Sequence, residues 1–79
     1  MILRSSARKH GIKEADTVQA AEEPLFLASL DDDNPQRELR LGFDTQGRLL
    51  ETVVLIWDDG TEEVIHSMKA RKQYLSLLG

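Results

Sequence analysis

Two short turn sequences fix the outline of the second half of the chain. Asp44-Thr45-Gln46-Gly47 and Asp58-Asp59-Gly60 combine aspartate with glycine, which readily adopts the left-handed backbone of a tight hairpin turn. They separate three segments with strand-like composition, residues 37–43, 48–57 and 61–68. Because tight turns join antiparallel neighbours, this pattern predicts a three-stranded antiparallel meander.

The segments beside these turns differ in how they would be buried. In residues 37–43, Leu39, Leu41 and Phe43 alternate with charged or small residues, which is typical of a strand with one face on the core. Residues 48–57 are apolar on both faces and rich in β-branched side chains. We therefore expect that segment to be the central strand.

Three helices are predicted outside the meander. A short one over residues 7–10 would end at Gly11, and a second over residues 13–23 would end at Pro24. The third would occupy residues 69–78. One face of the second helix would carry Ala15, Val18 and Ala21 or Glu22. The apolar stripe of the third would be Tyr74, Leu75 and Leu78.

These elements define an α+β domain that spans residues 1–79. It has two N-terminal helices, an antiparallel β-meander of three to four strands (residues 25–30 supply the fourth), and a C-terminal helix packed on the sheet. The core of so short a chain is thin, and without cysteine no disulfide supports it. The longest apolar run is far shorter than the roughly 20 residues of a membrane helix, and no signal peptide is visible, so we expect a cytoplasmic protein.

The charges are sorted along the chain. Residues 1–13 and 66–79 hold seven of the ten basic residues and no acids, whereas all fourteen acids lie in residues 14–65. The net charge of −4 argues against a general nucleic-acid binder. If the two ends pack side by side, however, an acidic protein would carry one basic face.

Metal-free cleavage of RNA is a reaction that these cations could perform. It needs a base for the 2′-hydroxyl proton, an acid for the leaving oxygen and cations for the phosphate charge. The sequence offers Lys9, His10, Arg37, His66, Lys69 and Arg71. Each also has an ordinary structural interpretation, as a helix-end, strand or surface residue. The acidic stretch 31–33 is typical of a solvated turn, so we expect no metal and no cofactor.

Four short motifs, in order along the chain, resemble those of BrnT-type toxins. The family's opening K-H-G-[VI] appears as residues 9–12, and its arginine before a strand that ends in glycine appears in residues 37–42. Its G-R-L-L is residues 47–50. Its closing segment, similar to V-I-R-I-I-S-A-R-K-A, aligns without a gap with residues 64–73. The resemblance extends over nearly the whole chain.

The resemblance implies a RelE-type fold, in which helices pack on an antiparallel sheet. It also implies the toxin component of a bacterial type II toxin–antitoxin system, a metal-independent endoribonuclease that a cognate antitoxin neutralises. Matched position by position, the candidate catalytic residues are Lys9, His10, Arg37 and Arg71, and His66 stands where the family has arginine. The basic neighbours expected to bind the RNA substrate are Arg8, Lys69 and Lys72.

Departures from the family pattern leave a second function open. His66 in place of arginine could preserve a cation, supply acid–base chemistry or mark a loss of activity. The final helix, arginine-rich in the family, is nearly neutral here. The alternative is a non-catalytic protein-interaction module that keeps the toxin fold, and a structural homodimer is a third interpretation. A docking edge for such a partner is the stripe of Tyr74, Leu75, Leu77 and Leu78.

Overall fold

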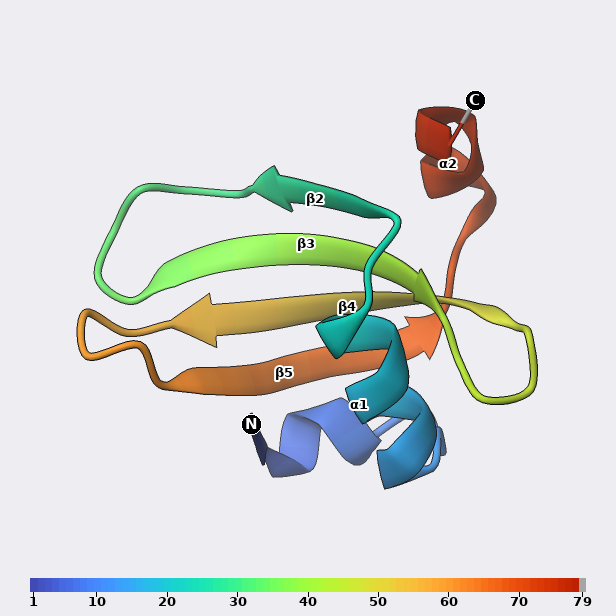
Figure 1. The fold of residues 1–79 in the computed structure, drawn as a ribbon, viewed down its shortest axis with the longest axis horizontal. Helices are drawn as coiled ribbons and strands as arrows, with labels where there is room; N and C mark the ends of the chain where they lie inside the picture. The colour runs from blue at the N-terminus through green and yellow to red at the C-terminus, as the bar shows by residue number, and fades with distance from the viewer. Residues whose placement is uncertain (79) are drawn as a thin grey trace.

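Three long antiparallel strands form the middle of a five-stranded sheet. A computed structural model of the chain describes residues 1–78, and in it β3 (Gln36–Phe43), β4 (Leu49–Ile56) and β5 (Glu62–Lys69) follow one another through two hairpin turns (Figure 1). Gly47 and Gly60 close these turns with φ of 78° and 87°, the left-handed region that glycine adopts without steric strain. Both predicted hairpins are confirmed.

Two short strands extend this meander and make the sheet mixed. β2 (Phe26–Ser29) pairs antiparallel with β3, and β1 (Ile2–Leu3) pairs parallel with β5, so the strand order is β1-β5-β4-β3-β2. The prediction of a purely antiparallel sheet of three to four strands is therefore wrong. A two-residue strand is too short to show any hydrophobic period, so the sequence gives no sign of β1.

The helices are fewer and shorter than predicted. The first predicted helix is a single 3₁₀ turn, η1 (Ser5–Arg8), which leaves α1 (Glu14–Glu22) as the one N-terminal α-helix. Between strand β1 and Gly11, where φ is 73°, too few residues remain for a stable α-helix. No helix within residues 1–78 is long and apolar enough to cross a membrane.

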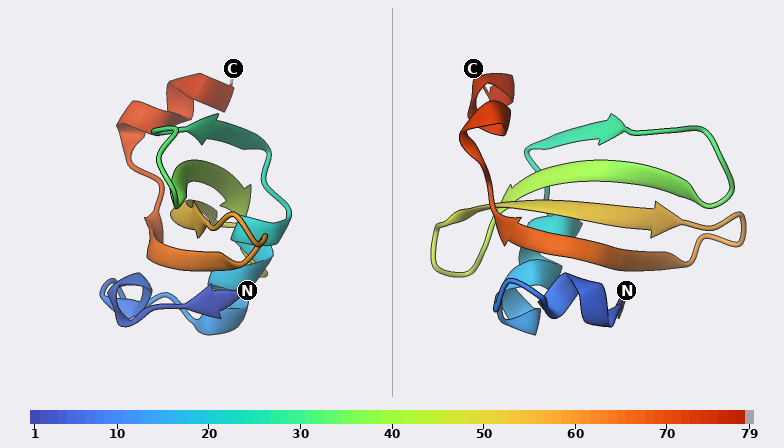
Figure 2. Two further views of the ribbon diagram at one scale, coloured as in Figure 1. Left: turned by 90° about the vertical axis from the view of Figure 1, so that its left-hand side faces the viewer. Right: turned by 180° about the vertical axis from the view of Figure 1, so that it is seen from behind.

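The prediction of a C-terminal helix that packs on the sheet is also wrong. β5 continues to Lys69, and Arg71 has an extended backbone with ψ of 156°, so α2 (Lys72–Leu75) starts late and has only four residues. A 3₁₀ turn, η2 (Ser76–Leu78), follows it. Neither element buries a residue, and α2 stands off one corner of the sheet (Figures 1 and 2).

Helix α1 packs across one face of the sheet. It contacts β3 at Gly42, where only a hydrogen fits beneath the main chain of Ala20. The side chain of Thr17 forms a hydrogen bond with that of Ser67 on β5, with 2.7 Å between the two hydroxyl oxygens. The buried residues of α1 are Asp16, Thr17, Ala20 and Ala21. Of the predicted face, Ala21 is therefore buried, whereas Ala15 is exposed and Val18 is only partly buried. Two polar side chains are buried here because each finds hydrogen-bond partners.

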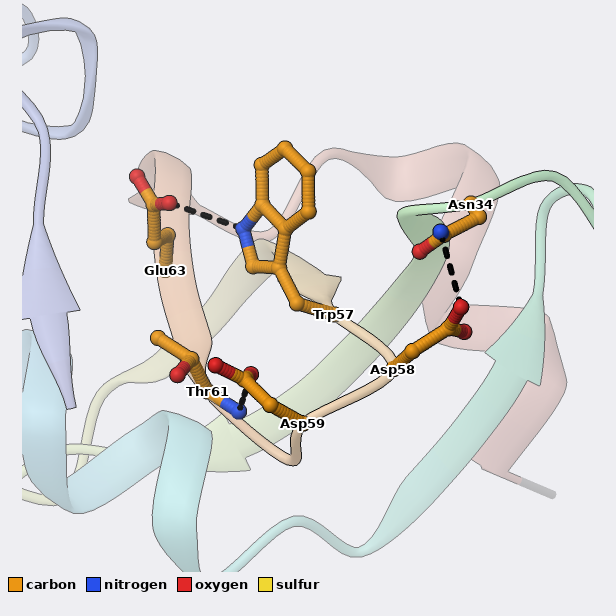
Figure 3. Close-up of a pocket in the computed structure, with 6 residues that line it drawn as sticks. All are labelled: Asn34, Trp57, Asp58, Asp59, Thr61 and Glu63. Carbon is orange, nitrogen blue, oxygen red and sulfur yellow. Dashed lines mark hydrogen bonds between the residues drawn. The ribbon is translucent and has the colours of Figure 1, made fainter.

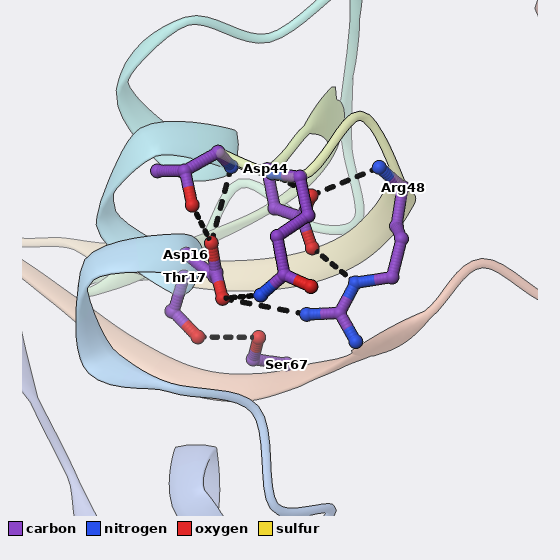
Figure 4. A network of polar contacts seen from close by, with 7 residues as sticks. Asp16, Thr17, Asp44, Arg48 and Ser67 are labelled. Carbon is purple, nitrogen blue, oxygen red and sulfur yellow. Dashed lines mark hydrogen bonds and ion pairs between the residues drawn. The ribbon is translucent and has the colours of Figure 1, made fainter.

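A polar network ties the start of α1 to the β3–β4 turn (Figure 4). The buried carboxylate of Asp16 accepts hydrogen bonds from the main chain and hydroxyl of Thr45, and from the side chains of Gln46 and Arg48. Arg48 also binds Asp44, with 2.6 Å between Nε and Oδ2. Arg48, the arginine of the motif Gly47–Leu50, thus has a structural role, because it holds the β3–β4 turn against α1.

The two faces of the sheet have different contents. Beneath η1 and α1, the core consists of Ala7, Ala21, Val54 and Val64, with Leu3 and Ile56 packed against it. The register of β3 with β4 places Leu39, Leu41, Leu55 and Glu51 on the opposite face, and all four are buried. A charged residue is therefore buried on the face that α1 does not cover.

Candidate functional site

The two histidines of the chain meet, although 56 residues separate them in the sequence. The ring centroids of His10 and His66 lie 5.6 Å apart, and the rings stand edge to face at 78°. Pairing of β1 with β5 and a 3.0 Å hydrogen bond from the Arg4 main-chain nitrogen to the Val64 oxygen hold the N-terminal segment along β5. The N-terminal basic segment, residues 1–13, therefore meets the start of the C-terminal one, residues 66–79, at this contact.

Glu51 on β4 forms a hydrogen bond with one of these histidines, His66. Its side chain is only 1% exposed, and its Oε2 lies 2.9 Å from Nε2 of His66. An ionised carboxylate can only accept a hydrogen bond, so Nε2 of His66 carries the proton. In the neutral ring, Nδ1 is then the nitrogen that can accept a proton from a substrate.

Arg71 binds the same carboxylate. The main-chain nitrogen of Arg71 and its Nε lie 3.0 Å and 2.9 Å from Glu51 Oε1, and its second terminal nitrogen lies 2.9 Å from Oε2. This two-pronged contact fixes the guanidinium beside His66. The Arg71 side chain remains half exposed and stacks over the ring of Tyr74, 5.5 Å from its centroid.

The charge of Glu51 is stable in this setting. Burial alone would raise the pKa of Glu51, but hydrogen bonds from Arg71 and His66 outweigh it and hold the pKa below its ordinary value. The same contact raises the pKa of Arg71, through the hydrogen bonds to Glu51 and the attraction between the two charges. The carboxylate and the guanidinium are therefore both ionised across the neutral range.

The structure does not bring Arg37 to this cluster. Arg37 lies on β3, which β4 separates from β5, and it is paired in register with Leu55. The Nε atom of Arg37 lies 2.6 Å from Oδ2 of Asp31. The main-chain nitrogen of Arg37 donates a second hydrogen bond to the other oxygen of the Asp31 side chain. The hydrogen bonds from Arg37 lower the pKa of Asp31. This cation belongs to the β2–β3 loop.

The other predicted cations are exposed and adjoin the cluster along the chain. Lys9 directly precedes His10 at the end of η1, and Lys69 and Lys72 lie on either side of Arg71, at the end of β5 and the start of α2. Arg8 forms an exposed ion pair with Glu14, at 3.2 Å. Lys69 pairs with Leu50, whose other neighbour Gly42 lies under α1, so the Lys69 side chain is on the face of α1 and not on the face of Glu51 and His66. The basic neighbours of the cluster along the chain are therefore Lys9 and Lys72.

Glu51 is the member of this site that sequence reasoning missed. It is the single acid in the strand Leu49–Ile56, which the sequence predicts to be central and apolar on both faces. A lone carboxylate in such a strand needs charged or hydrogen-bonding partners when it is buried. The presence of one acid in a strand that is otherwise apolar was therefore the sequence feature that could have indicated Glu51 as part of a site. Within residues 1–78, no three histidine, cysteine, aspartate or glutamate side chains are grouped so that they could hold a metal ion.

Comparison of the chain with protein-family models, with curated proteins and with solved structures gives no match. The likeness to BrnT-type toxins therefore rests on the four short motifs. What the structure adds is the spatial arrangement of two imidazoles, one guanidinium and the buried carboxylate that positions two of these three groups.

Proposed function

We propose that this protein is a metal-independent endoribonuclease that acts as the toxin component of a bacterial type II toxin–antitoxin system. The observation that carries the proposal is the contact of His10 with His66 beside Arg71, with Glu51 anchoring both His66 and Arg71. Two imidazoles can act as the base and the acid of the reaction, and a guanidinium provides the fixed cation that a phosphate needs. The motif resemblance supplies the link to toxins.

In the proposed reaction, His66 is the base. Glu51 holds Nε2–H of His66 and stabilises the positive ring that forms when Nδ1 takes a proton. The proton comes from the ribose 2′-hydroxyl, whose oxygen attacks the adjacent phosphorus. The bond from phosphorus to the 5′-oxygen breaks, and His10 in its protonated form donates to that oxygen. The products are a 2′,3′-cyclic phosphate and a 5′-hydroxyl end.

Arg71 stabilises the charge that develops on the phosphate. Two of its side-chain nitrogens bind Glu51, and the guanidinium presents its remaining N–H groups to a phosphate oxygen. Because Glu51 is buried and bonded on both oxygens, its own charge is largely compensated. Lys9 and Lys72, next to His10 and Arg71 in the chain, add positive charge for the bound strand.

Expression in a bacterial host tests this proposal. Induction of the wild-type chain should arrest growth and fragment cellular RNA, and co-expression of the protein encoded by the neighbouring reading frame should restore growth. His10→Ala and His66→Ala should relieve the arrest at equal protein levels. Lys13→Ala, which removes an exposed cation from the same segment, is the matched control and should remain toxic. Intact RNA and normal growth with the wild-type chain would contradict the proposal.

A second candidate function is supported by a different observation. Leu75, Leu77 and Leu78 are 49%, 45% and 38% exposed on the short C-terminal helices. Exposed leucines grouped in this way are typical of a protein-binding edge, as a non-catalytic interaction module would need. That function would show as tight binding of a partner, lost on Leu75→Ser with Leu78→Ser, in a protein that leaves RNA intact.

A further inference from the structure

A surface hollow lies at the end of the sheet opposite α2. Its volume is about 420 Å³. Its walls come from the loop before β3, the β4–β5 turn and the start of β5 (Figure 3). Trp57 stands over the hollow. The lining residues are Asn34, Trp57, Asp58, Asp59, Thr61 and Glu63.

Hydrogen bonds hold the walls of this hollow in place. The indole nitrogen of Trp57 donates to Glu63 at 2.8 Å, and Asn34 donates to Asp58 at 2.9 Å (Figure 3). The main chain of Thr61 donates to Asp59, also at 2.9 Å. The orientation of the indole ring and of all three carboxylates is therefore set before any ligand arrives.

Two carboxyl groups of the hollow, those of Asp59 and Glu63, have lowered pKa values. Hydrogen bonds from Thr61 lower the pKa of Asp59, and the hydrogen bond from Arg4 lowers the pKa of Glu63. Arg4 lies 2.6 Å from Glu63 and compensates one of the three charges. Half of the six lining residues are acidic and none is basic, so the hollow retains a negative potential.

We infer that this hollow binds an organic cation, an alkylammonium or guanidinium group of the kind that ends a lysine or arginine side chain. The indole ring of Trp57 offers an aromatic face, which attracts such cations, and Asp58 and Asp59 offer acceptors for their N–H groups. An anion would be repelled, and an apolar ligand would strip water from carboxylates that it could not bind. This site is separate from the histidine cluster and independent of the proposed ribonuclease activity.

Trp57 reports directly on this binding because it is the only tryptophan of the chain. The full-length protein would be titrated with acetyl-Gly-Arg-Gly-amide, acetyl-Gly-Lys-Gly-amide and spermidine at constant ionic strength, while the indole N–H resonance is followed by NMR. Acetyl-Gly-Glu-Gly-amide is the ligand control. A saturable shift is expected with the cations and none with the acidic peptide.

Paired variants separate this site from general attraction to an acidic protein. Asp58→Asn with Asp59→Asn removes two charges but keeps an oxygen acceptor for Asn34 and Thr61, and should weaken cation binding about fivefold. Glu22→Gln with Glu23→Gln removes two exposed charges from the end of α1, outside the hollow, and should leave binding unchanged.

The outcomes assign the source of the cation as well. Saturable binding of the peptides alone assigns the hollow to a basic side chain of a polypeptide, and binding of spermidine assigns it to a free polyamine. Binding of either kind of cation supports the inference if the Asp58→Asn, Asp59→Asn protein binds it more weakly than the wild type does. A resonance that no cation shifts, or equal affinities in the two double variants, would overturn it.

Discussion

Arg71 binds the buried carboxylate of Glu51 through its main-chain nitrogen, its Nε and one terminal nitrogen, at 3.0, 2.9 and 2.9 Å. This contact decides the course of the chain after β5. It keeps Arg71 extended, delays the start of α2 and places a guanidinium beside His66. One ion pair therefore shapes both the C-terminal fold and the candidate site.

Removal of the Glu51 side chain should destabilise the protein. Glu51→Ala deletes the acceptor of four hydrogen bonds from His66 and Arg71, so the free energy of unfolding should fall by about 2–3 kcal/mol. Thermal unfolding should show a melting temperature lower by about 10 °C or more. Glu14→Ala, in an exposed ion pair, is the control and should change little. Equal melting temperatures for the two variants would contradict this role of Glu51.

The contribution of Glu51 to stability should depend on pH. Its pKa in the folded protein lies below the ordinary value of 4.5, so between these two values the unfolded chain binds more protons than the folded one. The stabilisation is then fully present above about pH 4.5 and is lost as the pH falls through the folded pKa. Glu51→Gln lacks this group. The difference in unfolding free energy between the wild type and Glu51→Gln, measured by urea denaturation, should shrink from about pH 6 to about pH 3. A constant difference would argue against an ionised Glu51.

Gly42 should not tolerate a side chain. A Cβ atom there would overlap the carbonyl oxygen of Ala20 and lie 3.1 Å from its carbonyl carbon, so α1 would have to move off the sheet. Gly42→Ala should reduce the unfolding free energy by about 1–3 kcal/mol. Chemical denaturation of the purified variant measures this directly, and wild-type stability would show that α1 does not pack at Gly42.

Substitution of Gly47 should also destabilise the protein, but because of its backbone conformation rather than a close contact. Its φ is 78°, and apart from Gly47 itself and its two chain neighbours no atom lies within 4 Å of a Cβ placed there. Gly47→Val should therefore cost about 1–2 kcal/mol through strain, because a β-branched residue disfavours this conformation. Gly47→Asn should cost less, since asparagine tolerates positive φ. Similar melting temperatures for the two variants would count against a left-handed turn.

The hairpins could be predicted because their signals are local. Aspartate and glycine mark both turns, and alternation along β3 reports a period of two. The ends of the chain were predicted wrongly because tertiary contacts decide them. Residues 69–78 have the composition of a helix, yet pairing with β4 keeps Lys69 in the sheet, and Glu51 holds Arg71 extended.

The candidate site was only partly predictable for the same reason. His10, His66 and Arg71 could be named from their chemistry and from the family resemblance, but the contact between the histidines depends on β1 lying parallel to β5. Arg37 has the chemistry of a phosphate ligand, but its position on β3 beside Asp31 follows from the strand order. Strand order depends on contacts between segments that are distant in the sequence, so local patterns of residue types do not predict it.

Cleavage of RNA by the purified protein in the presence of a chelator tests the central proposal most directly. A short RNA and the same strand with 2′-deoxyribose throughout would be incubated with the wild type, His10→Ala, His66→Ala, Arg71→Ala and the control Lys13→Ala, each shown to be folded. The account expects the wild type and the control to cleave only the RNA, leaving 2′,3′-cyclic phosphate ends, and each of the other variants to be slower by about 10²–10⁴-fold. Undiminished cleavage by His10→Ala and His66→Ala, or an intact RNA after incubation with the wild type, would contradict it.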